Sequence, residues 1–342
     1  MWFCHIYDDI ISVENLLSAW REFLRDKRNR KDVERFSIHL TDNIFALHRE
    51  LVNKTYQHGP YKAFKISDPK PREIHKASVR DRLLHHAIYR ILYPRIDPKF
   101  IFDSYSCRRT KGTHRAINRF REYSRKTSRN HTRTVWVLKC DIRKFFANID
   151  HEILVEILTK RLKNKDATCL LNNIVGSFNT KDRSGVGLPL GNLTSQLLVN
   201  IYMNEFDHFL KRELKITHCV RYADDFIILH ENKDYLESIL PKISEFLKTR
   251  LKLSLHPDKV FIKTLASGVD FLGWVHFPHH RVPRTSTVRR MFRNLKNNSK
   301  KESLTSYLGL LSHGDAYKLS QSIQDSKGQE KLKGKRNKGS KF

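Results

Sequence analysis

One stretch decides the fold of this chain: Val220-Arg221-Tyr222-Ala223-Asp224-Asp225-Phe226-Ile227-Ile228-Leu229. Strand-forming residues lie on both sides of two adjacent aspartates, which predicts a β-hairpin with Ala223, Asp224 and Asp225 at or near its turn. Adjacent carboxylates at a hairpin tip repel each other, and a hard divalent cation would relieve that repulsion. Aspartate also favours ordinary turns, so the pair by itself leaves a purely structural interpretation open.

The composition indicates a folded protein with a polyanionic partner. The 342 residues are 39% hydrophobic and 30% charged, and the formal net charge is +29. Such an excess points to nucleic acid, with a membrane surface as the alternative. No run of about 18 apolar residues predicts a membrane span, and Asp8 and Asp9 interrupt the N-terminal apolar run, so no secretory signal is expected. Five scattered cysteines without a CxxC pair predict a reduced, cytoplasmic protein without a zinc ribbon.

A third acidic residue ends an apolar strand. The strand is expected at Val135-Trp136-Val137-Leu138-Lys139-Cys140-Asp141, and an amphipathic helix follows after His151. Ligands bind where strands end, although a lone aspartate there is also a common turn residue. Phosphoryl transfer between polyanions uses two divalent cations about 4 Å apart, held by carboxylates from separate strands. Asp141 with Asp224 and Asp225 is a set of that kind.

Basic side chains concentrate in the N-terminal half. Residues 12–24 and 33–53 predict helices, residues 61–76 a strand pair with a Pro-containing turn, and residues 79–92 a further helix. Arg72, Lys76 and Arg82 lie on this strand pair and helix. The functional interpretation is a clamp on phosphates, because arginine matches phosphate geometry; the other is a solvated basic face.

The remaining elements are expected in a simple order. A basic loop spans 104–114, residues 121–133 predict a further loop, and a glycine-rich loop at 185–196 leads into a long helix. Residues 234–251 predict a helix, Lys259 follows a Pro turn, and residues 268–275 predict a tight hairpin. Residues 286–321 are expected to be helical, and 327–342 form a basic, disordered tail.

Taken together, these motifs resemble those of reverse transcriptases. Residues 222–225 match the family's Tyr-x-Asp-Asp box, residues 141–146 its first palm motif, and residues 271–273 its primer-grip hairpin. The resemblance implies an α+β right-hand polymerase. Its parts would be an N-terminal helical extension (1–60), fingers (61–134), a palm of antiparallel sheet backed by helices (135–275), a helical thumb (276–326) and the tail. No maturase, endonuclease or RNase H segment is expected.

The resemblance also assigns roles to residues. Asp141, Asp224 and Asp225, with the carbonyl of Ile142, would bind two Mg²⁺ ions, for which Mn²⁺ could substitute. The family's nucleotide site corresponds to Arg72, Lys76, Arg82, Phe145, Phe146 and Gln196, and Phe146 would exclude a ribose 2′-hydroxyl. The template and primer would contact Gly191, Ser195, Tyr222, Phe271, Leu272 and Gly273. Lys259 would protonate the leaving pyrophosphate, or is an ordinary surface lysine.

The glycine motif points to a subtype. Its Gly191-x-x-x-Ser195-Gln196 form resembles the motif in enzymes of diversity-generating retroelements. Most bacterial reverse transcriptases, such as group II intron and retron enzymes, carry Gln-Gly and Ser-Pro in this motif instead. That resemblance implies copying of a template RNA into cDNA with errors at adenines, and a small, basic, oligomeric accessory protein as partner. The alternatives are a reverse transcriptase of a retron-like, group II intron-like or defence system, and a non-catalytic RNA-binding protein on the same fold.

Overall fold

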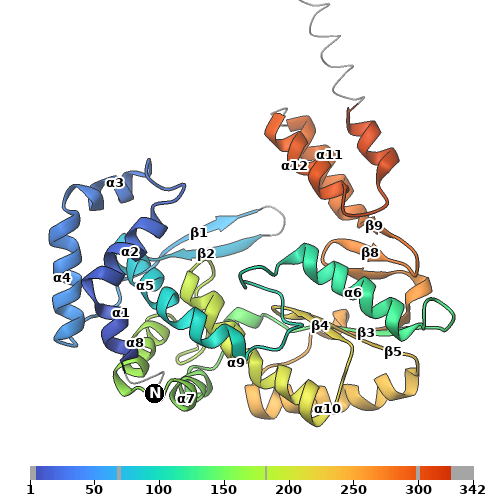
Figure 1. Ribbon diagram of the computed structural model, residues 1–342, viewed down its shortest axis with the longest axis horizontal. Helices are drawn as coiled ribbons and strands as arrows, with labels where there is room; N and C mark the ends of the chain where they lie inside the picture. The colour runs from blue at the N-terminus through green and yellow to red at the C-terminus, as the bar shows by residue number, and fades with distance from the viewer. Residues whose placement is uncertain (1–4, 68–70, 182, 298–300, 325–342) are drawn as a thin grey trace, which may run out of the picture. The chain divides into compact units, whose positions relative to one another are not determined.

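The computed structural model describes residues 5–67, 71–181, 183–297 and 301–324. Helices and small sheets are mixed along the described chain, which confirms the predicted α+β class (Figure 1). The chain divides into two compact units. The first comprises Met1–Gly112, Lys139–Ile227 and Glu237–Val260, and the second comprises Thr113–Leu138, Ile228–Leu236 and Phe261–Phe342. The expected tail at 327–342 lies outside the described residues.

Four helices open the first unit: α1 (Ile6–Ile11), α2 (Val13–Phe23), α3 (Lys31–Ile38) and α4 (Leu40–Val52). Ser12 caps α2 as expected, because its side chain accepts a hydrogen bond from the backbone N–H of Asn15. The apolar face of α2 packs against α5 (Val79–Ile96), and these helices lie together in Figure 1. The single helix expected over 33–53 is wrong: the chain leaves helical geometry at His39, between α3 and α4.

The predicted strand pair is present as β1 (Lys62–Ile66) and β2 (Arg72–Lys76). The strands are antiparallel, with Lys62 opposite Lys76 and Ile66 opposite Arg72. Ser78 then caps α5 by accepting from the backbone N–H of Asp81. This helix runs four residues beyond the expected end at Leu92, to Ile96, with Pro94 inside it and the short 3₁₀-helix η1 (Asp97–Lys99) after it.

A four-stranded sheet has the order β4-β5-β3-β6. Its strands are β3 (Trp136–Asp141), β4 (Cys219–Tyr222), β5 (Asp225–His230) and β6 (Phe261–Thr264). The expected strand ending at Asp141 and the expected hairpin around Asp224 are therefore confirmed. Side chains inside β3 and β5 are buried, as their apolar composition requires.

The segments between β3 and β6 in the sequence contain the helices α7 (His151–Leu162), α8 (Lys165–Gly176), α9 (Leu193–His208) and α10 (Lys233–Leu251). The long helix expected after the glycine loop is α9, which packs against α5 and α7. It ends in a π-helical turn, η3 (Phe209–Glu213), while the 3₁₀-helices η2 (Phe145–Asn148) and η4 (Pro257–Lys259) follow the ends of β3 and α10.

The second unit contains α6 (Thr113–Thr127), η5 (Leu265–Ser267) and an antiparallel sheet of β7 (Val269–Phe271), β8 (Trp274–His276) and β9 (Arg281–Pro283). The hairpin expected at 268–275 is thus confirmed. The loop expected over 121–133 is wrong as far as Thr127, where α6 ends, and correct from 128 to 133. The buried face of α6 (Ala116, Ile117, Phe120 and Tyr123) has helical spacing, and this outweighs the polar residues between.

Two further helices complete the second unit, α11 (Thr285–Asn297) and α12 (Lys301–Leu311), and residues 317–324 are also helical. Their shared core consists of Met291, Leu295, Leu311, Ala316 and Ile323. The helical character expected over 286–321 is therefore largely correct. Among the described residues, no helix combines the length and the apolar character needed to cross a membrane.

Candidate active site

The turn between β4 and β5 carries the adjacent aspartates. Ala223 adopts a left-handed conformation with φ of 56°, which reverses the chain, and Asp225 begins β5. The backbone carbonyl of Asp224 accepts a hydrogen bond from the backbone N–H of Ile142 at 3.1 Å. The turn is therefore attached to the residue that directly follows β3.

Asp141 ends β3, and two contacts hold it. Its backbone carbonyl accepts from the N–H of His256 at 2.7 Å, and Lys259 Nζ donates to its Oδ1 at 2.9 Å. The side chain of Asp141 is only 17% exposed, whereas that of Lys259 is 42% exposed. Lys259, which the sequence associates with catalysis, is thus brought directly to an acidic residue of the site.

The carboxylates of Asp141 and Asp224 repel each other. Burial raises the pKa of Asp224, and the negative charge of Asp141 raises that pKa further, against smaller opposing effects of Lys259 and Arg72. Two half-buried acids with this mutual repulsion favour a bound cation. In the folded chain, Asp141 and Asp224 are the two residues whose interaction supports the predicted acidic cation site.

Asp225 has a different neighbour. Lys139 lies within β3 and is nearly buried, and its Nζ is 3.6 Å from Oδ2 of Asp225. The sequence reasoning missed Lys139, although a lysine inside the apolar run 135–140 was the available signal. Asp225 is therefore partly neutralised by the protein itself.

The donors at this place fit a divalent cation, because carboxylate and backbone carbonyl oxygens are the ligands that Mg²⁺ prefers. The raised pKa of Asp224, caused by burial and then by Asp141, fits the same conclusion. Within the described ranges, however, no three His, Cys, Asp or Glu side chains already form a cluster that could hold a metal ion. The set of Asp141, Ile142, Asp224 and Asp225 therefore stays a prediction.

The three basic residues expected at the nucleotide are divided between two acidic partners. Arg72 begins β2, is exposed, and acts electrostatically on Asp224. Lys76 and Arg82 instead both donate to Oδ2 of Asp32 in α3, each at 2.6 Å. The sequence reasoning overlooked Asp32, because an acid in the first turn of a helix is ordinary dipole chemistry.

The glycine loop is bound to the β1–β2 hairpin. The backbone N–H of His75 donates to the carbonyl of Leu190 at 3.1 Å, and the Asn192 side chain donates to the carbonyl of His75 at 2.8 Å. Gly191 has φ of 98°, and a Cβ there would lie 2.8 Å from Cγ2 of Ile74. Glycine is therefore required at Gly191 both by conformation and by the close approach of β2.

Gln196 and Ser195 lie in the first turn of α9. Ser195 is buried, while Gln196 and Gly191 line a cavity of about 390 Å³ together with Lys76 and Arg82. This cavity brings several of the predicted nucleotide and template residues to one place. Its other lining residues come from α2, the following loop, β1, β2, α5 and the glycine loop.

The two phenylalanines after Asp141 differ in exposure. Phe145 is buried and Phe146 is half-buried, with ring centroids 5.6 Å apart. The backbone carbonyl of Phe146 accepts from the N–H of Leu188 at 2.8 Å, which joins this segment to the glycine loop. Of the two rings, Phe146 is the one with surface left for a ligand.

The remaining template and primer candidates occupy two places. Tyr222 ends β4 beside the aspartate turn and is half-buried. The turn of Phe271, Leu272 and Gly273 lies in the second unit, where Leu272 and Gly273 have positive φ. Phe271 is buried against Phe120, so its ring serves the core of that unit.

The basic loop at 104–114 is largely structural. Ser104 pairs with Arg221 of β4 in a parallel bridge, and the guanidinium of Arg108 binds the carboxylate of Asp97 and the carbonyls of Ile101 and Ser104. Arg108 is therefore committed to intramolecular contacts rather than free for a nucleic-acid backbone.

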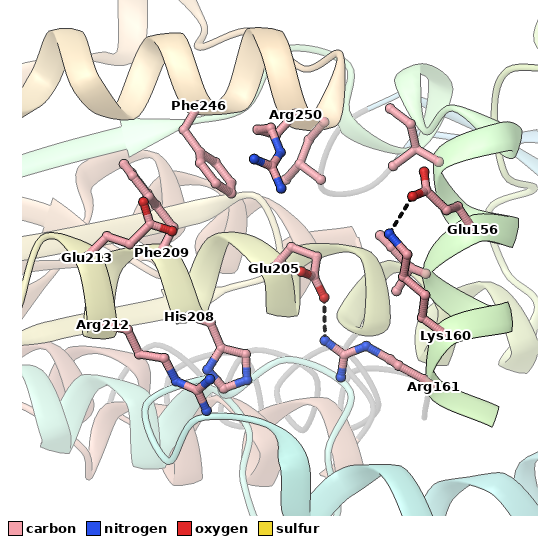
Figure 2. A pocket seen from close by; sticks show the side chains of 13 residues that line it. Glu156, Lys160, Arg161, Glu205, His208, Phe209, Arg212, Glu213, Phe246 and Arg250 are labelled. Carbon is pink, nitrogen blue, oxygen red and sulfur yellow. Dashed lines mark hydrogen bonds and ion pairs between the residues drawn. The ribbon is translucent and has the colours of Figure 1, made fainter. Parts of the chain in front are cut away.

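A second hollow, of about 310 Å³, lies between α7, α9, η3 and α10, and Figure 2 shows its side chains. Arg161 of α7 donates to Glu205 of α9 at 2.5 Å, and Lys160 pairs with Glu156 at 2.5 Å. It contains none of the predicted site residues, and four of its charged side chains form these two pairs.

Comparison with known proteins agrees with this geometry. The family model for reverse transcriptase (RNA-dependent DNA polymerase) matches residues 65–276, more than half of the chain. The chain therefore belongs to the reverse transcriptase family of RNA-directed DNA polymerases.

Two curated relatives show the extent of the similarity. Protein YkfC of Escherichia coli is 28% identical over 269 residues, which cover 66% of this chain and 69% of YkfC. The group II intron-encoded protein LtrA of Lactococcus lactis is 22% identical over 318 residues, which cover 73% of this chain and 51% of LtrA. The chain thus spans about half the length of LtrA.

A solved structure supports the fold. The apo telomerase of Candida tropicalis, truncated from its C-terminal domain, aligns with a TM-score of 0.50 and 13% identity. The alignment covers 72% of this chain and 60% of the telomerase chain. This likeness confirms the predicted right-hand polymerase fold.

Proposed function

We propose that this chain copies a template RNA into complementary DNA by adding deoxynucleotides to a primer. The proposal is carried by one observation in a member of the reverse transcriptase family. The charge of Asp141 acts on Asp224, and Lys259 donates a hydrogen bond to Asp141. The net charge of +29 supports an RNA template and an RNA–DNA hybrid as partners.

The reaction needs few groups from the protein. The primer's 3′-hydroxyl loses its proton to water, its oxygen forms a bond to the α-phosphorus of the incoming nucleotide, and the bond from that phosphorus to pyrophosphate breaks. Asp141, Asp224, Asp225 and the carbonyl of Ile142 would hold two Mg²⁺ ions, or Mn²⁺ in their place, which when bound supply positive charge to the reacting phosphates. Lys259 would donate a proton to the departing pyrophosphate.

Residues around the glycine loop would select the nucleotide. Arg72 would bind the triphosphate directly, whereas Lys76 and Arg82 would have to exchange the Asp32 carboxylate for phosphate oxygens. Phe146 would contact the sugar, with Phe145 supporting it from the core. Gln196, Gly191, Ser195 and Tyr222 would face the template and primer, and the 271–273 turn would contact the primer.

Primer extension on an RNA template with Mg²⁺ tests this proposal. Asp224→Asn should abolish extension, because one carboxylate of the repelling pair is lost. Asp234→Asn, at an exposed position in the first turn of α10, is the matched control and should extend like the wild type. Equal extension by Asp224→Asn and the wild type would end the catalytic assignment of Asp224, whereas no extension by the wild type would favour a non-catalytic RNA-binding protein.

We further propose that the chain serves a diversity-generating retroelement, with errors at template adenines and a small, basic, oligomeric accessory protein. The Gly191-x-x-x-Ser195-Gln196 motif supports this, since Gln196 lines the cavity beside Gly191. The backbone N–H of Gln196 bonds to Asn192 at a long 3.4 Å, so Gln196→Pro removes little helix bonding. That variant should change the error spectrum at adenines; an unchanged spectrum would contradict the role of Gln196.

A group II intron-like role is the second candidate, and the similarity to LtrA favours it. The neighbouring DNA distinguishes the two roles. A near-repeat that differs at adenines supports the diversity-generating role, whereas a flanking intron RNA supports the alternative.

A further inference from the structure

The residue before the Tyr-x-Asp-Asp box makes an unusual set of contacts. Arg221 is 2% exposed, although it lies in a strand, and Asp207 of α9 is fully buried beneath it. Nε and Nη2 of Arg221 donate to the two carboxylate oxygens of Asp207, both at 2.6 Å. Nη2 also donates to the Ser104 hydroxyl at 2.9 Å. The buried pair is thus bidentate and further hydrogen-bonded.

The remaining nitrogen of the guanidinium reaches the catalytic turn. Nη1 donates to the backbone carbonyl of Ala223 at 3.1 Å. Ala223 is the left-handed residue whose conformation sets the direction of the chain at Asp224. Because alanine does not favour that conformation, an external contact is needed to hold it.

The peptide groups on both sides of the turn are therefore fixed. Arg221 holds the carbonyl of Ala223, and the N–H of Ile142 holds the carbonyl of Asp224. Arg221 itself is anchored by its backbone, since its N–H donates to Asp103 and its carbonyl accepts from Tyr105, each at 2.9 Å. Asp224 therefore lies between two peptide carbonyls that each accept a hydrogen bond, and one of the two donors is the buried side chain of Arg221.

We propose that Arg221 and Asp207 are positioning residues for Asp224. Asp207 aligns the guanidinium, and the guanidinium fixes the left-handed turn that aims the Asp224 carboxylate at Asp141. The effect on catalysis rests on the proposed catalytic role of Asp224, whereas the hydrogen bond by which Arg221 supports the turn is independent of that role.

Two variants of the full-length chain separate positioning from general stability. Arg221→Lys keeps the charge opposite Asp207 but has no fork to reach both Asp207 and Ala223. The paired variant Arg221→Met with Asp207→Leu removes the buried charges together, which commonly preserves stability. Arg161→Lys is the matched control, because Arg161 of α7 pairs with Glu205 of α9, the helix that also carries Asp207 (Figure 2).

Three measurements are compared: thermal unfolding, primer extension with separate kcat and KM, and hydrogen exchange of the backbone amide of Ile142. We expect both Arg221 variants to lower kcat about 100-fold while the KM for deoxynucleotides stays within about twofold. The Ile142 amide should exchange faster in both, because its acceptor at Asp224 is no longer held. Arg161→Lys should match the wild type in all three measurements.

Two results would overturn the proposal. One is a paired variant that folds stably and extends primers at the wild-type rate, which would make the ion pair merely structural. The other is a slow variant whose Ile142 amide keeps wild-type protection. If the wild-type chain extends no primer, the proposed function fails, and the exchange at Ile142 still decides whether Arg221 supports the turn.

Discussion

Lys259 Nζ lies 2.9 Å from Oδ1 of Asp141, although the two residues are 118 positions apart. The contact places an ammonium group against the carboxylate that ends β3. The sequence leaves two interpretations of Lys259 open, and this contact gives Lys259 a defined partner in the candidate site.

Replacement of Lys259 should slow the chemical step. Lys259→Met removes the proton donor, and general acid catalysis typically contributes about 10²- to 10⁴-fold, so kcat should fall within that range. Lys259→Arg should restore the contact with Asp141 but little of the rate, because a guanidinium does not release its proton. Single-turnover primer extension measures both, with the exposed Lys263→Met as control. Wild-type kcat in Lys259→Met would leave Lys259 as an ordinary surface lysine.

Asp32 should compete with the incoming nucleotide for the side chains of Lys76 and Arg82. Burial opposes ionisation of this carboxyl, but hydrogen bonds and charges of Lys76 and Arg82 hold its pKa below the ordinary value. Asp32→Asn should release both cations and lower the KM for deoxynucleotides by about two- to fivefold, since half-exposed ion pairs contribute at most about 1 kcal/mol. Steady-state extension kinetics test this, with exposed Asp42→Asn as the control. An unchanged or higher KM would show that Asp32 does not compete.

Phe146 should decide the choice of sugar. Phe146→Ala removes the half-buried ring, and discrimination against ribonucleotides should fall by about 10- to 200-fold, the range typical of a small steric difference. Competition between dNTPs and rNTPs in primer extension measures the ratio. Phe145→Leu is the comparison, because this buried ring should affect thermal stability more than sugar choice. Sugar discrimination that is equal in Phe146→Ala and the wild type would remove Phe146 from the role.

His85 should make stability depend on pH. Burial lowers its pKa to about 3, and it is 1% exposed. An unfolded histidine takes up a proton below about pH 6.5, while the folded one stays neutral, so unfolding binds protons and stability falls as the pH is lowered from about 6.5 towards 3. His85→Gln should weaken this dependence.

Urea unfolding of His85→Gln and the wild type at about pH 7 and about pH 5 provides the measurement. His39→Gln, at an exposed position, should keep the wild-type dependence. The same loss of stability in all three chains would mean that other buried groups, such as His86, dominate the effect.

Local sequence rules predicted much of the framework. The turn at Asp224 follows from strand-forming residues on both sides of two acids, and the strand end at Asp141 follows from the apolar run before it. Ser12 at the start of α2 is a local capping signal of the same kind. These features depend on neighbours in the chain, so the sequence carries them directly.

The same rules failed where distant packing prevailed. Residues 121–127 are too polar to predict a helix, yet α6 continues through them because Phe120 and Tyr123 are buried in the second unit. The break at His39 between α3 and α4 had no glycine or proline to mark it.

What the sequence by itself determined is the strand ends and turn that carry the proposed acidic ligands, and the order of the motifs, because spacing along the chain encodes turns, strand ends and helix starts. Only the tertiary structure decided which cation meets which acid: Lys259 with Asp141, Lys139 with Asp225, and Arg221 with Asp207. Each pair joins different elements, and with 65 lysines and arginines against 36 acids the sequence allows many other pairings. Burial selects among them, because a charge removed from water requires a partner at hydrogen-bonding or ion-pair distance.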